Sequence, residues 1–130
     1  MTFEDGFKTW LWSSTRTGVP ASVRAFSFNL YELANSDSPF GVELIGSSDF
    51  DIEDSDWACE NVWAATPRML EIPVAFSSRS WEACLAAIRR LVVAAIDEDS
   101  AGEVLKSREG IAVGFIDGDL DLVWHRQLAH

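Results

Sequence analysis

The 130-residue sequence predicts a single α+β domain, residues 1–130, with an antiparallel sheet of about five strands. We expect an N-terminal helix and one long central helix to pack on one face of this sheet. Two observations carry the prediction: a broad apolar stripe with helical spacing runs through residues 81–96, and an Asp-Gly turn separates two alternating apolar runs near the C-terminus. With 48% apolar residues, the chain can bury one core.

The N-terminal part of the chain predicts a helix followed by a hairpin. Apolar residues within 3–11 recur at helical spacing, and the Gly-Val-Pro sequence that follows ends this helix. Residues 23–33 alternate between apolar and polar side chains, which predicts a strand. Turn-forming residues at 35–39 then lead to a short second strand at 40–45, so we expect the two strands to pair.

The remainder predicts a loop, a strand, the long helix and a final hairpin. Residues 47–60 have neither helical nor strand periodicity and are too rich in carboxylates for a buried element, so we expect a surface loop pinned by Phe50, Ile52 and Trp57. Residues 69–76 resume a strand pattern in which a proline indicates an edge position. Ser80 is a good N-cap for the long helix, and residues 117–119 form the Asp-Gly turn of the hairpin.

The aromatic residues and cysteines are mostly assigned to the interior. Trp10, Trp81 and Trp124 match apolar faces of their predicted elements, and we expect them in the core. Cys59 and Cys84 have neither CxxC spacing nor a paired histidine, so they predict buried free thiols instead of a redox or zinc site.

The negative charge is concentrated in one stretch of the chain. The formal net charge is −11, and the stretch between Arg24 and Arg68 holds no base. The nine carboxylates of this stretch are Glu32, Asp37, Glu43, Asp49, Asp51, Glu53, Asp54, Asp56 and Glu60. A local field of one sign attracts a positively charged partner and repels nucleic acid. We therefore expect a basic protein partner and no direct contact with DNA or RNA.

Standard catalytic and targeting patterns are missing from the sequence. It has two histidines and lacks GxSxG, GK[ST] and HExxH motifs, so we expect neither an enzyme nor a cofactor. The acidic N-terminus does not resemble a signal peptide, and no apolar run is long enough to cross a bilayer, which predicts a cytoplasmic protein that does not bind membranes. A carboxylate pair of a small hydrolase is a weaker alternative.

Calcium binding is another alternative. In residues 49–60, acids fall at positions one, three, five and twelve of a twelve-residue loop, with Ser55 at position seven, as in an EF-hand. The pattern fails at position six, where Asp54 replaces the glycine of the sharp turn, and a strand instead of a helix is predicted before the loop. We therefore assign no metal site. A calcium-binding or regulatory adaptor domain remains an alternative function.

Two segments, GVELIGSSDFDIEDSDWACENVW and GIAVGFIDGDLDLVWH, resemble those of small acidic bacterial immunity proteins that accompany polymorphic or contact-dependent toxins. The resemblance implies a non-catalytic inhibitor that covers the active site of a cognate toxin domain or blocks its activation. Under this reading, acids of the loop attract and pair with basic side chains, and Trp57 supplies an aromatic anchor or packs in the core. The predicted contact residues are Asp49, Asp51, Glu53, Asp54, Asp56, Trp57 and Glu60.

Overall fold

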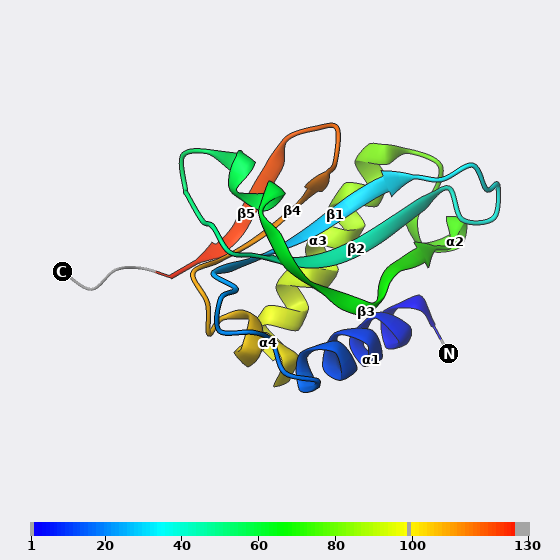
Figure 1. Ribbon diagram of the computed structural model, residues 1–130. Helices are drawn as coiled ribbons and strands as arrows, with labels where there is room; N and C mark the ends of the chain where they lie inside the picture. Colours follow the sequence, from blue (N-terminus) through cyan, green and yellow to red (C-terminus); the bar gives the residue numbers. More distant parts are fainter. Residues whose placement is uncertain (1, 99, 127–130) are drawn as a thin grey trace.

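The computed structural model describes residues 2–98 and 100–126, which form one five-stranded sheet and its helices (Figure 1). In chain order the elements are α1 (Phe3–Arg16), β1 (Ala25–Glu32), β2 (Phe40–Ser47), the 3-10 helix η1 (Ser55–Cys59), β3 (Asn61–Ile72), α2 (Val74–Ser77), α3 (Trp81–Glu98), α4 (Ser100–Leu105), β4 (Gly110–Phe115) and β5 (Leu120–His125). The predicted α+β class is confirmed. Of the helices in these residues, none has the length and apolar character needed to cross a lipid bilayer.

The strand order is β3-β2-β1-β4-β5, and one pairing differs from the predicted antiparallel sheet. β1 and β4 run parallel, with Ala25 opposite Gly110 and Leu30 opposite Phe115, whereas the other neighbouring strands are antiparallel. The long helix α3 causes this direction, because it carries the chain from the end of β3 back to the end of the sheet where β1 begins. The sheet is therefore mixed.

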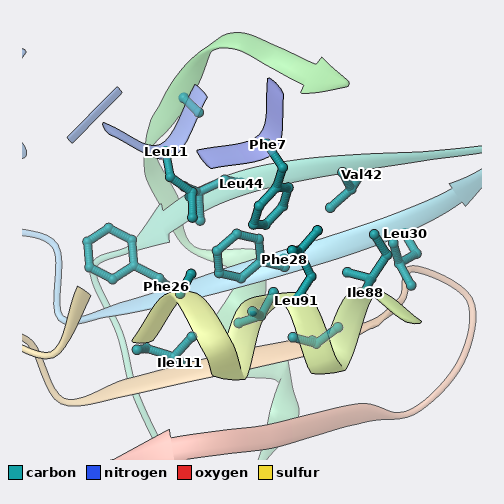
Figure 2. Close-up of a cluster of buried hydrophobic side chains, with 14 of the residues drawn as sticks. Phe7, Leu11, Phe26, Phe28, Leu30, Val42, Leu44, Ile88, Leu91 and Ile111 are labelled. Carbon is teal, nitrogen blue, oxygen red and sulfur yellow. The ribbon is translucent and has the colours of Figure 1, made fainter. Parts of the chain in front are cut away.

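Both predicted helices cover the same face of the sheet. Phe7 of α1, Phe28 of β1 and Ile88 of α3 belong to one buried cluster, and Figure 2 shows side chains of the two helices meeting those of the strands. The rings of Phe7 and Phe28 have their centroids 5.9 Å apart. At the start of α3, the Ser80 hydroxyl accepts a hydrogen bond from the backbone N–H of Ala83, as an N-cap should.

Several local predictions were wrong. The strand predicted at 69–76 overlaps β3 only at residues 69–72, because β3 begins earlier, at Asn61, and ends at Ile72. The residues after Pro73 form α2, since a proline cannot extend the ladder. Trp81 was expected in the core, but its side chain is 54% exposed at the first turn of α3. Cys59 is exposed instead of buried, since the short η1 helix turns it outward.

Other interior predictions were correct. Trp10 is buried, and its indole N–H donates to the backbone carbonyl of Pro67 at 2.6 Å. Trp124 is half-buried and packs against the main core. Cys84 is buried in α3, and this burial raises the pKa of its thiol to about 12.

Candidate protein-binding surface

The segment between β2 and β3, residues 48–60, forms a closed loop that we call the acidic loop. At its base, the backbone N–H of Ser48 donates to the carbonyl of Glu60 at 2.9 Å. The Ser47 hydroxyl also donates to the carbonyl of Trp57 at 2.5 Å. These two bonds hold the two sides of the loop together where β2 ends and β3 begins.

An aromatic pair fixes the acidic loop on the face of the sheet opposite the long helices. Trp57 packs with Ala25 and Ala112, and the rings of Trp57 and Phe50 have their centroids 5.3 Å apart. Gly110 leaves room for Phe50, because a Cβ atom at residue 110 would lie 2.3 Å from Cε1 of that ring. Trp57 is only 4% exposed. It is therefore part of a small core, and we withdraw it as an exposed aromatic anchor.

Five of the predicted contact residues are exposed carboxylates of this loop. They are Asp51, Glu53, Asp54, Asp56 and Glu60. None of them forms an ion pair with any base in residues 2–98 or 100–126. Their charge is therefore directed to the solvent and is not neutralised by a described arginine or lysine of the same chain.

Two of these carboxylates also stabilise the loop itself. A side-chain oxygen of Asp51 accepts a hydrogen bond from the backbone N–H of Glu53 at 2.9 Å. Asp54 caps η1 in the same way, accepting from the N–H of Asp56 at 3.0 Å. No described donor bonds to the carboxylates of Glu53, Asp56 and Glu60, so these three side chains are available to a partner.

The sixth predicted acid is paired within the protein. Asp49 lies 3.5 Å from a guanidinium nitrogen of Arg24, and the same arginine makes a bidentate pair with Glu109, at 2.7 Å through Nε and 3.0 Å through Nη2. The hydrogen bond from Arg24 lowers the pKa of Glu109 below its usual value, against a smaller opposing effect of burial. Asp49 thus contributes less to an outward negative field than the sequence suggests.

A hollow of about 570 Å³ lies beside the acidic loop. Its lining combines Phe50, Asp51, Ile52 and Glu53 with Glu109 and Arg126. The Ile52 side chain is 60% exposed, so it does not pin the loop as expected. Ile52 can contact the methylene stem of a basic side chain whose charged head pairs with the carboxylates of the lining, and Arg126 places one positive charge in the same lining.

A buried polar cluster is a feature that the sequence analysis missed. Glu43 is only 5% exposed and accepts hydrogen bonds from Asn29 Nδ2 at 2.9 Å, from the Tyr31 hydroxyl, and from Arg68 Nε at 2.9 Å. The Ser27 hydroxyl extends the cluster by donating to Asn29 at 2.6 Å. We call these five residues the polar cluster. The predicted hairpin contained a signal for it, because Asn29 stands directly opposite Glu43 in the register of β1 and β2.

The hydrogen bonds of the polar cluster keep Glu43 ionised. Burial alone raises the pKa of a carboxyl group, but the bonds from Tyr31, Asn29 and Arg68 outweigh it, so the pKa of Glu43 is lowered. Burial and then the bond to Glu43 raise the pKa of Tyr31. Glu43 therefore acts as a structural acceptor between strands and not as part of the outward acidic field.

The acidic loop does not have the architecture of an EF-hand. It follows strand β2 and contains the 3-10 helix η1, whereas an EF-hand loop joins two α-helices. In the part of the chain that the structure describes, no three His, Cys, Asp or Glu side chains are grouped so that they could hold a metal ion.

Comparison of the chain with protein-family models, curated proteins and solved structures found no match. Any assignment of function therefore has to come from the geometry and charge of this surface.

Proposed function

We propose that this chain is a non-catalytic immunity protein that neutralises a bacterial toxin domain by docking the acidic loop on its basic surface. One observation carries the proposal: five exposed carboxylates stand on one closed loop and are not paired with any described base of the chain. Such a field accelerates encounter with a cationic surface and forms charge-assisted hydrogen bonds with its arginine and lysine side chains.

The construction of the loop supports docking over simple solvation. Its base is closed by hydrogen bonds and its centre is held by Phe50 and Trp57, so the loop loses little conformational entropy when a partner binds. Ile52 offers an apolar contact within the charged surface. The carboxylates of the loop would then set the specificity and raise the association rate, and the contact with Ile52 would exclude water from the interface.

The hydrolase alternative has less support from the carboxyl groups. A general acid in glycoside hydrolysis needs a raised pKa. Glu43 and Glu109 both have a lowered pKa, and each is paired with an arginine. Their environments favour the ionised form, which cannot donate a proton.

The partner is first isolated by passing a lysate of the native host over the immobilised protein. The proposal is then tested on the toxin domain that this column retains. The informative variant combines Glu53→Gln, Asp56→Asn and Glu60→Gln, because these side chains accept no described hydrogen bond. At about 0.2–1 kcal/mol for each exposed ion pair, we expect affinity to fall by roughly three- to 150-fold in calorimetry. The salt dependence of the dissociation constant should flatten, and the melting temperature should not change.

A control variant carries the same change in net charge elsewhere. Glu4→Gln, Glu98→Gln and Glu103→Gln remove three exposed carboxylates from α1, α3 and α4. We expect this variant to bind as the wild type does and to protect cells that express the toxin. If both variants bind with wild-type affinity, the acidic loop is not the interface. If the chain binds the toxin domain but leaves its activity intact, the protein is an adaptor and not an immunity protein.

A further inference from the structure

A second hollow lies at the other end of the sheet from the acidic loop. Its volume is about 240 Å³, and it is lined by Glu32, Trp81, Phe115, Asp117 and Gly118. Three elements meet there: the end of β1, the first turn of α3, and the turn between β4 and β5. We call it the Trp81 hollow. Gly110, which contacts the acidic loop, is separated from Phe115 by the length of β4, roughly 17 Å for five strand steps.

Trp81 is held in place from one side and open on the other. Its ring meets the ring of Phe115 edge-on, with centroids 6.1 Å apart and an interplanar angle of 87°. Phe115 in turn rests on Phe40 at 5.6 Å, so the support belongs to the core. More than half of the Trp81 side chain is nevertheless exposed, which is costly for so large an aromatic group. A fixed, exposed tryptophan is the type of residue that dominates the energy of protein interfaces.

The charges around the ring favour a cation. Glu32 and Asp117 are exposed, and neither is paired with a base among the described residues. The N-terminus of α3 contributes about half a positive charge, which would favour an anion, but Glu82 in its first turn offsets this effect. Two full negative charges in the lining then exceed what remains of the helix dipole.

We propose that the Trp81 hollow binds an arginine side chain of a protein partner. A guanidinium group is planar, stacks on an aromatic face, and pairs with carboxylates through several N–H donors, so it matches Trp81 flanked by Glu32 and Asp117. Lysine offers a point charge without the planar stacking. The inference does not depend on the acidic loop or on a toxin, because the two surfaces share no residue.

The test uses the full-length ¹⁵N-labelled protein and two peptides, Ac-Gly-Arg-Gly-NH₂ and its neutral citrulline analogue, at constant ionic strength. The indole N–H signal of Trp81 is assigned by its loss in Trp81→Phe. We expect saturable shifts of this signal and of the Gly118 amide with the arginine peptide, and at least about five-fold weaker binding of the citrulline peptide. Equal shifts with both peptides would overturn the proposal, as would shifts confined to the acidic loop.

Two carboxylate variants and one control sharpen this result. Glu32→Gln and Asp117→Asn should each raise the dissociation constant of the arginine peptide about two- to five-fold, whereas Glu103→Gln on α4 should leave it unchanged. These variants keep the aromatic contacts, so they remain informative if Trp81→Ala impairs folding. Wild-type affinity in both carboxylate variants would refute the proposed site, whatever the outcome of the toxin-binding experiment.

Discussion

Replacing Glu43 with methionine removes the acceptor at the centre of the polar cluster while keeping an unbranched side chain of similar length. Asn29 and Tyr31 then lose an acceptor in a partly buried environment, and Arg68 loses its ion pair. An unsatisfied buried donor costs about 1–3 kcal/mol, and partial burial places both donors in the lower half of that range. The Arg68 pair contributes less, roughly 0.2–1 kcal/mol, because the arginine side chain is 53% exposed.

We therefore expect Glu43→Met to lower the free energy of unfolding by about 2–5 kcal/mol, measured by urea denaturation with circular dichroism. The double variant Tyr31→Phe/Glu43→Met tests the mechanism, because Tyr31→Phe removes one orphaned donor. The double variant should lose about 1 kcal/mol less unfolding free energy than the sum of the losses in Tyr31→Phe and Glu43→Met. A loss below about 0.5 kcal/mol for Glu43→Met, or strict additivity in the double variant, would refute the assigned role of Glu43.

The same side chain predicts a pH dependence. Because the folded-state pKa of Glu43 is lowered, its contribution is complete above the unfolded pKa, near 4.5, and is lost as pH falls through the lower folded value. The stability difference between wild type and Glu43→Met should therefore be constant at neutral pH and shrink on acidification below about 4.5. A difference that grows in acid would contradict the direction of this shift.

The remaining predictions concern the loop support and the thiols. Gly110→Ala should destabilise the protein by about 1–3 kcal/mol in the same urea assay, because the added methyl group would overlap the ring of Phe50; wild-type stability would show that the ring does not need this space. A thiol-specific chromogenic reagent should label Cys59 rapidly in the folded protein and Cys84 only after unfolding, since burial raises the pKa of Cys84 to about 12. Labelling of both thiols at similar rates would contradict the assigned burial.

The elements that could be predicted from the sequence are those fixed by neighbouring residues. Ser80 begins α3 through a bond to the backbone three residues later, and the Asp117-Gly118 turn joins β4 to β5. In both cases, the atoms that decide the structure lie within a few positions of one another. Their side-chain chemistry alone was therefore sufficient to place the long helix and the last hairpin.

The parallel pairing of β1 with β4 could not be predicted in the same way. The alternation of apolar side chains in either strand is the same whether its neighbour is parallel or antiparallel. The direction follows from the path of the chain, because α3 returns it across the sheet before β4 begins. The predicted order did contain a strand, a helix and a strand in succession, which is compatible with a parallel arrangement. It did not identify β1, instead of β3, as the neighbour of β4.

Burial of single residues was the least predictable property. Trp57 stands among carboxylates in the sequence, yet it is buried because Phe50 and two alanines on neighbouring strands surround it. Trp81 lies at the expected start of an apolar helix, yet this first turn extends beyond the edge of the core. In each case, exposure depends on segments distant in the chain, which local periodicity does not report.

The fold divides the acidic stretch of the sequence into parts with different physical roles. Of its nine carboxylates, Glu43 and Asp49 are paired with arginines, and Glu32 and Asp37 lie toward the opposite end of the β1–β2 hairpin, so five remain on the acidic loop. The charge available for docking there is thus about half of what the sequence suggests. Because Glu32 lines the Trp81 hollow, the exposed acids of this stretch lie on two separate surfaces and do not form one continuous field, and each surface is a separate proposal for cation binding.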